Sequence, residues 1–261
     1  MRASEPRPPS LRWRLSSVWY RHMRVYTRNL ISNGLPPFLE PIIFLVGIGL
    51  GLGRYIAEME GVPYLVFLAA ALPSTSAMFT SAYECTFGTY VRLEFQKAYD
   101  GMVAAPVTVG DLFVGEILWA GSKGLFFSAC VVLVMALAGA LPMPAGLVAV
   151  PIGFLTGTMF GALSLVVAAF VRNINHFNFY FTGFLSPMFF FAGTVFPLES
   201  LPRVLRPFAE IMPLTHSVRL TRSLVTGRPS AVLLADLAFL VVVTVGAGWY
   251  AIRRLRMRIV V

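Results

Sequence analysis

Residues 145–171 read AGLVAVPIGFLTGTMFGALSLVVAAFV and contain no acidic or basic side chain. A helix needs about 20 apolar residues to cross the hydrocarbon core of a bilayer, and this stretch is long enough. The mostly apolar residues 112–141 precede it, and the uncharged link Leu141-Pro142-Met143-Pro144 joins the two. These runs therefore predict two membrane helices that form a tight hairpin across the outer face.

Four more apolar runs complete the pattern, at residues 35–53, 63–83, 177–196 and 232–252. The chain is 57% hydrophobic and 13% charged, whereas soluble domains are about 25% charged. The predicted fold is an all-α membrane protein with six transmembrane helices. Residues 1–34 form a cytoplasmic amphipathic connecting segment, and residues 35–261 form the six-helix domain.

Basic side chains set the expected orientation, because Lys and Arg are enriched in cytoplasmic loops. If six spans alternate, one side collects the arginines from Arg2 to Arg28, Arg92 and Lys97, Arg172, and the cluster from Arg253 to Arg258. That side is predicted to be cytoplasmic and to hold both termini. The net charge of +9 therefore fits anionic lipid headgroups better than nucleic acid.

The connection before the last span, residues 197–230, is an exception to this rule. It is predicted to be external although it holds five arginines, which are Arg203, Arg206, Arg219, Arg222 and Arg228. Long external segments follow the rule less strictly. Its apolar residues recur at helical spacing, interrupted by Pro202 and Pro207. We expect a broken, partly re-entrant helical hairpin on the outer side.

The stretch from Leu11 to Leu30 has an amphipathic pattern of its own. Apolar residues such as Leu15, Val18 and Trp19 recur at helical spacing opposite several arginines. This pattern is typical of a helix that lies on a membrane surface. No uninterrupted apolar core follows the N-terminal arginines, so a cleaved signal peptide is not expected.

Several motifs for catalysis are missing from the sequence. No Gly-Lys pair exists for a phosphate-binding loop, and neither HExxH nor GxSxG occurs. Cys85 and Cys130 lie far apart and outside any CxxC spacing, which predicts neither a disulfide framework nor a zinc site. The chain is expected to be no enzyme and to hold no cofactor or metal.

The second connection, residues 84–110, is the most polar internal stretch. A short helix over Glu94–Met102 would place Glu94, Lys97 and Asp100 on one face and Phe95 and Tyr99 on another. Charged residues can set register on a soluble partner while aromatic residues fill a pocket. We expect these five residues to couple the chain to a partner, and the alternative is a solvated loop.

Lys123 is an ammonium group about 20 Å along the third predicted span. Glu116 lies two helical turns earlier, too far for a direct pair unless water or another helix intervenes. Glu84 and Asp111 are further acidic residues near the predicted cytoplasmic ends of these spans. Lys123 is expected either to line a polar pathway or meet an anionic headgroup, or to form a structural ion pair.

Five stretches carry a resemblance to a known family. They are residues 64–70 (YLVFLAA), 76–78 (SAM) with Glu84, 110–116 (GDLFVGE) with Trp119 and Lys123, 186–190 (SPMFF) through 195–197 (VFP), and 213–217 (PLTHS) with 227–229 (GRP). The chain resembles the NodJ-type branch of the type-2 ABC exporter permeases over nearly its whole length.

That resemblance implies six membrane helices, a connecting helix, a coupling helix and an external re-entrant hairpin, which here includes Arg203, Arg206 and His216. It implies two permease copies in the inner membrane, with two copies of a separate ATPase that binds ATP and Mg²⁺. In NodI–NodJ systems the substrate is a lipid-linked or lipid-modified saccharide, an amphiphilic, glycolipid-like molecule.

Other functions stay open on the residues alone. A drug or small hydrophobic-compound exporter of the same family is the nearest alternative. A membrane-embedded lipid enzyme would need paired carboxylates or histidines at one membrane depth, and an ion-coupled transporter would need repeats or broken helices with midplane carboxylates. Neither arrangement is evident in the sequence, and Asp236 is predicted to be too shallow.

Overall fold

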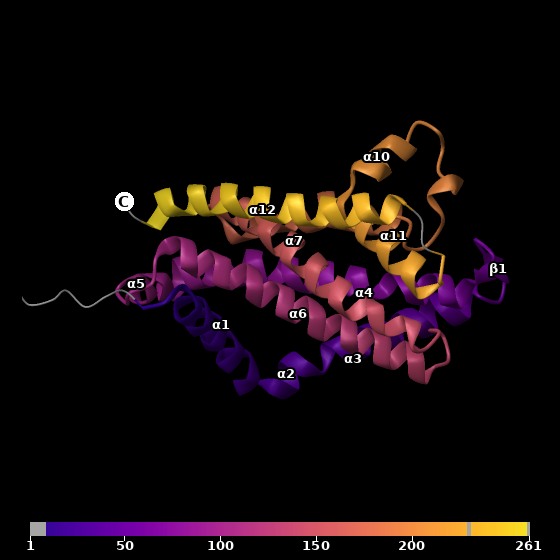
Figure 1. The fold of residues 1–261 in the computed structure, drawn as a ribbon, viewed down its shortest axis with the longest axis horizontal. Coiled ribbons are helices and arrows are strands. Elements are labelled where there is room, and N and C mark those ends of the chain that lie inside the picture. The colour runs from indigo at the N-terminus through magenta and orange to yellow at the C-terminus, as the bar shows by residue number, and fades with distance from the viewer. Residues whose placement is uncertain (1–8, 229–230, 260–261) are drawn as a thin grey trace, which may run out of the picture.

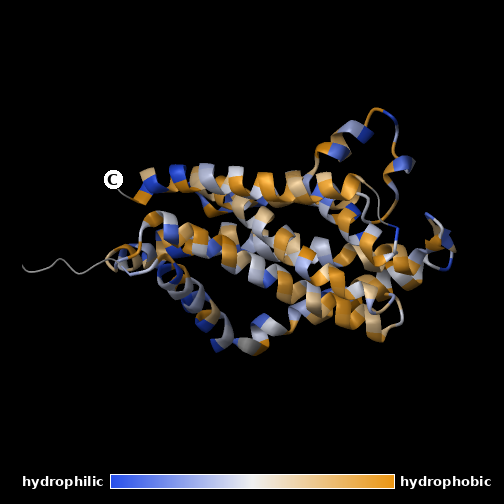
Figure 2. Cartoon of the chain, in the orientation of Figure 1, coloured by the Kyte–Doolittle hydropathy of each residue, from blue (hydrophilic) through white to orange (hydrophobic). Residues whose placement is uncertain are grey.

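The computed structural model describes residues 9–228 and 231–259 of the 261-residue chain. Arg2, Arg7 and Pro229 lie outside these residues. Five of the described helical runs are long and apolar enough to cross a membrane, at Ile31–Leu50, Tyr64–Phe95, Val109–Leu137, Ala145–Phe170 and Val232–Ile259. Figure 2 shows how hydrophobic residues cover these long helices. The prediction of an all-α membrane protein is confirmed.

The predicted span over residues 177–196 is shorter than expected. It consists of three consecutive helical segments, α8 (Phe177–Tyr180), η6 (Phe181–Leu185) and α9 (Ser186–Phe191), of four, five and six residues. Together they reach about 22 Å, less than the roughly 30 Å of the hydrocarbon core. Gly193, at φ +79°, follows their end. That this segment crosses the membrane stays a prediction.

Three long helices form the centre of the bundle. They are α4 (Tyr64–Tyr83), α6 (Val109–Leu137) and α7 (Ala149–Phe170), which pack against one another. Small residues permit the close approach of α6 and α7, since a Cβ on Gly157 would lie 2.8 Å from the Ala120 carbonyl oxygen. Residues 138–144 and the short helix η4 (Ala145–Val148) join the two helices in the predicted tight hairpin.

The N-terminal segment forms an arm along one flank of this bundle (Figure 1). The arm comprises α1 (Leu11–Arg28), α2 (Leu30–Gly34), α3 (Pro36–Phe44) and η1 (Leu45–Leu50). The amphipathic helix predicted within Leu11–Leu30 is thus present as α1, which ends at Arg28. One of its faces packs on α6 rather than on lipid, because Val18 is buried against Gly115 and Trp19 Nε1 donates to Ser122 Oγ at 2.9 Å.

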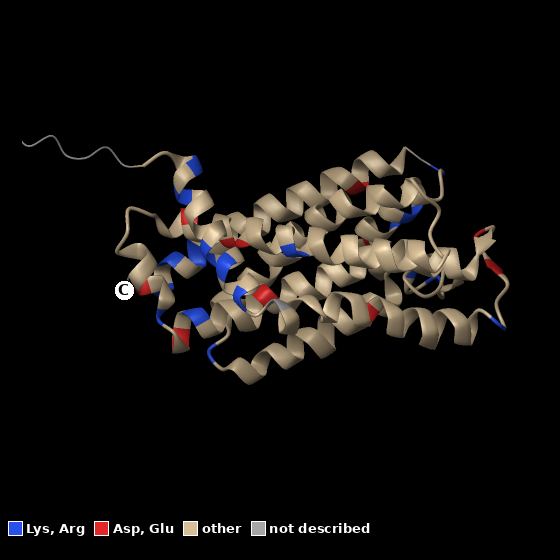
Figure 3. Ribbon diagram, turned by 90° about the horizontal axis from the view of Figure 1, so that it is seen from below, with Lys and Arg blue, Asp and Glu red and all other residues tan. Residues whose placement is uncertain are grey.

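The helix α12 (Val232–Ile259) lies along α7 on the other flank (Figure 1). It ends near α5 (Ala98–Val103), where Leu255 and Tyr99 belong to one apolar cluster. The opposite end holds the two-residue strands β1 (Glu58–Met59) and β2 (Val62–Pro63), which pair in an antiparallel hairpin. Figure 3 shows that most Lys and Arg residues gather at the α5 end, and that few charges interrupt the middle.

The region before α12 contains η7 (Leu198–Ser200), α10 (Arg206–Ile211) and α11 (Pro213–Val225). The chain breaks between α10 and α11 at Met212, whose backbone is extended before Pro213. The helix α11 packs against α4 and α12. Two broken helices are therefore present, while their insertion into the membrane from the outer side stays a prediction.

Candidate functional site

The second connection is built differently from the single helix that the sequence predicts. Two π-helical segments, η2 (Glu84–Gly88) and η3 (Val91–Phe95), continue α4 to Phe95. The chain then turns at Lys97, whose φ of +49° is left-handed, and α5 begins at Ala98. A non-glycine residue in this conformation interrupts a right-handed helix. The prediction of one helix from Glu94 to Met102 is therefore wrong.

A chain of three ion pairs lies beneath this connection. Lys123 Nζ is 3.0 Å from Glu84 Oε2, and Arg92 Nη1 is 2.7 Å from Glu84 Oε1. Arg92 Nε is in turn 3.0 Å from Glu116 Oε1. Glu116 and Lys123 are thus linked through Glu84 and Arg92, which belong to the helical continuation of α4. Glu116 is buried and the other three groups are largely shielded from water, so these charges need partners, and here each carboxylate has at least two donors.

Tyr99 joins the same network from α5. Its side chain is fully buried, its ring packs on Phe113 with centroids 5.7 Å apart, and its hydroxyl donates to Glu116 Oε1. Burial and the neighbouring Glu116 carboxylate raise the pKa of Tyr99 well above its usual value, so the phenol keeps its proton. Tyr99 therefore cannot be the partner-facing aromatic residue that the sequence predicts, because the turn at Lys97 directs it inward.

The other residues predicted for coupling lie on or near the surface. Phe95, Lys97 and Asp100 are exposed, and Phe95 exposes 67% of its area. Glu94 is partly exposed and pairs with Arg258 of α12 at 2.7 Å. The connection therefore has an outer surface that includes Phe95, Lys97 and Asp100, and an inner surface that reaches Glu116.

Asp111 lies apart from the ion-pair chain. Its carboxylate accepts from the Thr108 backbone N–H at 2.9 Å, and its own N–H donates to Thr108 Oγ1 at 3.1 Å. This reciprocal capping box begins α6. Arg14 Nη1 also lies 2.7 Å from Asp111 Oδ2. Asp111 thus caps α6 and ties the start of α1 to it.

His22 of α1 is a residue that the sequence did not single out. It is buried beside Trp119, and its Nε2 lies 3.6 Å from Glu116 Oε1, beyond hydrogen-bond distance. Burial, helped by the positive charge of Arg92, lowers the pKa of His22 to about 4. The imidazole is therefore neutral near pH 7 and forms no ion pair with Glu116 there.

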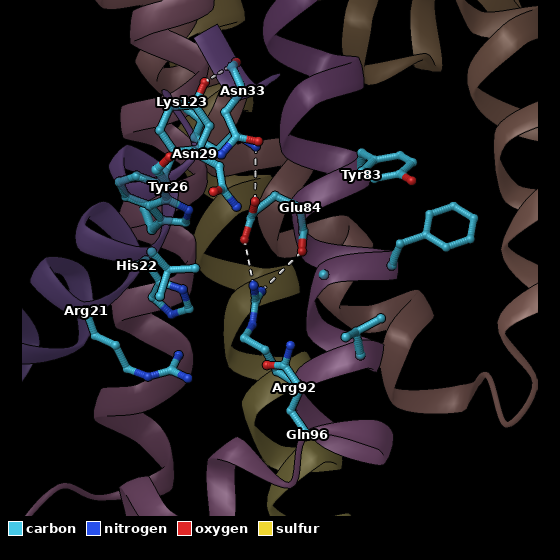
Figure 4. A pocket seen from close by; sticks show the side chains of 15 residues that line it. Arg21, His22, Tyr26, Asn29, Asn33, Tyr83, Glu84, Arg92, Gln96 and Lys123 are labelled. Carbon is cyan, nitrogen blue, oxygen red and sulfur yellow. Dashed lines mark hydrogen bonds and ion pairs between the residues drawn. The ribbon is translucent and has the colours of Figure 1, made fainter. Parts of the chain in front are cut away.

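A cavity of about 510 Å³ opens between α1, the end of α4 and α6 (Figure 4). Its polar lining residues are Arg21, His22, Tyr26, Asn29, Asn33, Tyr83, Glu84, Arg92, Gln96 and Lys123. Figure 4 shows Asn29 and Asn33 of the arm on one side, with Glu84 and Arg92 opposite. The ion-pair chain thus forms one wall of a cavity at the bundle surface.

The opposite end of the bundle holds a second set of charges. His216 Nδ1 lies 2.7 Å from Asp236 Oδ1, and Arg219 pairs with Asp236 at 2.6 Å and with Glu210 at 2.8 Å. Arg206 donates to the Leu201 and Glu199 carbonyl oxygens, while Arg203 is exposed. Asp236 lies near the start of α12, as the sequence predicts, and its fully buried side chain joins α11 to α12.

Glu40 of α3 is a second residue that the sequence reasoning missed. It lies inside the first candidate span, and Ser76 Oγ donates to its Oε2 at 3.4 Å. The available signal was a carboxylate within the apolar run 35–53, because ionisable residues inside membrane spans usually have a role.

Among residues 9–228 and 231–259, no group of three His, Cys, Asp or Glu side chains is arranged to hold a metal ion.

Comparisons with known proteins fit this architecture. Residues 14–225 match the family described as "ABC-2 type transporter". The chain is 35% identical to Nodulation protein J of Sinorhizobium fredii over 221 residues, or 85% of this chain and 84% of that protein. Nodulation protein J of Rhizobium meliloti is 33% identical, with the same coverage. The inner membrane transport permease YadH of Escherichia coli is 21% identical over 78% of this chain and 79% of its own length. On these grounds the chain belongs to the ABC-2 type transporter family of membrane permeases.

Proposed function

We propose that this permease exports a lipid-linked or lipid-modified oligosaccharide across the inner membrane, with energy from a separate ATPase subunit. The similarity to Nodulation protein J over more than four fifths of the chain supports the substrate class. The name of the Escherichia coli relative, an inner membrane transport permease, supports the location. Two permease copies and two ATPase copies would form the working assembly.

The observation that carries the proposal is the two-sided second connection. Its exposed surface offers an aromatic side chain, Phe95, beside the charged Lys97 and Asp100. Aromatic residues at interfaces commonly contribute most of the binding energy, and charges fix orientation. This surface is suited to a cleft on a soluble ATPase.

The inner side of the connection links the surface that faces the ATPase to the helix α6. Arg92 and Tyr99 come from either side of the turn at Lys97, and both contact Glu116, about two turns into α6. Because each group is hydrogen-bonded, and Tyr99 and Glu116 are also buried, the network favours discrete arrangements over gradual deformation. A displacement of the connection by the ATPase would therefore shift α6 against α4.

The distribution of charge supports a cytoplasmic position for the α5 end. Most basic residues gather there (Figure 3). At the other end, Arg219 is paired with acidic groups, and Arg222 donates to the carbonyl oxygens of Gly193 and Phe67. These arginines have structural partners, which explains how an external segment tolerates them despite the positive-inside tendency.

Reconstitution with the ATPase subunit encoded nearest to this chain tests the proposal. We expect the purified permease alone to hydrolyse no ATP, and the complex in vesicles to show ATP turnover that a lipid-linked oligosaccharide stimulates. Flipping of that lipid should depend on both subunits. Stimulation by hydrophobic drugs, without stimulation by the glycolipid, would instead favour the drug-exporter alternative.

A further inference from the structure

The cavity beside the ion-pair chain continues into a second one. This second cavity, of about 360 Å³, shares four lining residues with the first, namely Tyr26, Asn33, Tyr83 and Lys123. The two together form a groove between the arm and the bundle, which we call the arm groove. Its far part reaches Glu40 and Thr80, which lie within membrane spans.

The corner of the arm that lines this groove is held in place. Tyr26 Oη donates to the Asn33 carbonyl oxygen at 2.7 Å, and Asn33 Nδ2 donates to the Tyr26 carbonyl oxygen at 2.8 Å. This reciprocal pair joins α1 to the start of the first span. These hydrogen bonds therefore fix the position of the arm where it lines the arm groove.

The charge of the near part of the groove is positive. Arg21, Arg92 and Lys123 line it, against the single carboxylate of Glu84. Near pH 7 His22 adds no charge, because burial lowers its pKa to about 4. Glu116, which compensates Arg92 from behind, is not among the lining residues. Basic pockets between membrane helices on the cytoplasmic side are suited to anionic headgroups.

Two of these cations keep donors for a ligand. Lys123 has three N–H donors, and one of them serves Glu84. Arg21 has no hydrogen-bond or ion-pair partner within the part of the chain that the structure describes. Asn29 and Gln96 add neutral polar groups, while Val25 and Phe87 add apolar ones. The lining thus combines anion donors with apolar surface.

We propose that the arm groove binds the phosphate-bearing headgroup of a lipid from the cytoplasmic leaflet, with Arg21 and Lys123 as its anion contacts. The apolar tails would remain in the bilayer beside the arm. The lipid is either a resident anionic phospholipid or a phosphorylated amphiphile on its way to export. The proposal rests on the membrane orientation given above, but it holds whether or not the ATPase drives transport.

Native mass spectrometry of the purified full chain tests this with defined lipids. The chain is equilibrated with equal amounts of phosphatidylglycerol and phosphatidylcholine, and the ratio of retained lipids is measured. Wild type should retain phosphatidylglycerol preferentially. Arg21→Gln should lower that preference about fivefold, the effect of one basic residue near an anionic lipid.

Arg24→Gln is the matched control, because Arg24 lies on the same helix, is exposed and lines neither cavity. It should retain the wild-type preference, and both variants should melt like wild type. Equal losses in the two variants, or no preference in wild type, would overturn the proposal by showing only general surface attraction. Displacement of phosphatidylglycerol by a polyprenyl phosphate would identify a phosphorylated export substrate as the occupant, whereas retention of phosphatidylglycerol would identify a resident phospholipid.

Discussion

Tyr99, in the connection that faces the proposed ATPase, donates a hydrogen bond to Glu116, a buried carboxylate of the helix α6. The two residues are 17 positions apart, and the turn at Lys97 brings them together. Arg92 contacts both of them, at 3.2 Å from Tyr99 Oη and 3.0 Å from Glu116 Oε1. A surface loop is thus tied to the interior of the membrane domain through one hydrogen-bonded cluster.

Replacing Tyr99 with phenylalanine isolates this hydrogen bond. The ring would still pack on Phe113, while Glu116 would lose a donor and keep Thr89 and Arg92. A hydrogen bond to a charged group contributes about 2 kcal/mol, so the melting temperature of the purified chain should fall. Tyr55→Phe is the control, because Tyr55 is 88% exposed. Equal melting of both variants would argue against a structural role for the Tyr99 hydroxyl.

Acidification should weaken the docking of α1 through His22. Burial lowers the pKa of His22 in the folded state to about 4, from an ordinary value of 6.5. The unfolded state therefore binds more protons between these values, and stability is lost as the pH falls through this window. The loss should reach about 2 kcal/mol near pH 5 relative to neutral pH.

Thermal melts of wild type and His22→Gln at several pH values check this. The variant lacks the titrating group, so its melting temperature should depend less on pH than that of wild type in the same window. Parallel pH profiles for the two proteins would contradict the assignment of the effect to His22.

Arg222 should hold the helices α10 and α11 to the bundle. Its Nη2 donates to the Gly193 carbonyl oxygen at 2.7 Å, and its guanidinium carbon lies 3.5 Å from the centre of the Phe67 ring. Lysine keeps the charge but lacks the planar group that stacks and donates in two directions. We expect Arg222→Lys to cost about 2 kcal/mol.

Hydrogen exchange locates that effect. Peptides from α10 and α11 should exchange faster in Arg222→Lys, while Arg203→Lys should behave like wild type because Arg203 is exposed. Unchanged exchange in both variants would mean that other contacts, such as Arg219 with Asp236, suffice to hold these helices.

The orientation of the bundle predicts which positions a membrane-impermeant thiol reagent reaches from each side. Single cysteines at Arg172 and Arg256 should be labelled from the cytoplasm, and those at Glu58 and Glu199 from outside. The background lacks Cys85 and Cys130, which are both buried. Cytoplasmic labelling of position 199 would refute the proposed topology, and with it an odd number of crossings before that residue.

The spans could be predicted from sequence because hydropathy over about 20 residues is a local property. Residues 177–196 show what hydropathy leaves out, since the run carries no charge but its helix ends at Phe191, before Gly193. Composition alone does not reveal such an end. The tight hairpin at 141–144 could be predicted because its prolines and its lack of charge are also local signals.

The ion-pair network could be predicted only in part. Glu84, Glu116 and Lys123 were evident as charges in apolar surroundings, but their connection depends on Arg92, which π-helical segments rotate inward. The burial of Tyr99 depends on a left-handed Lys97, a conformation for which the sequence gives no signal because it is uncommon outside glycine and asparagine. Contacts between distant segments set both features.

Binding of the ATPase subunit to Phe95→Ala tests whether the second connection couples the permease to the ATPase. Phe95 is exposed at the α5 end, so its loss should leave the melting temperature unchanged while removing an aromatic contact of about 2 kcal/mol. We expect about thirtyfold weaker binding and a matching loss of substrate-stimulated ATP turnover. Phe208→Ala, which removes a comparably exposed ring at the opposite end, should bind normally. Wild-type affinity and turnover in Phe95→Ala, and also when Asp100→Ala is added, would contradict the coupling role and leave this connection a solvated loop.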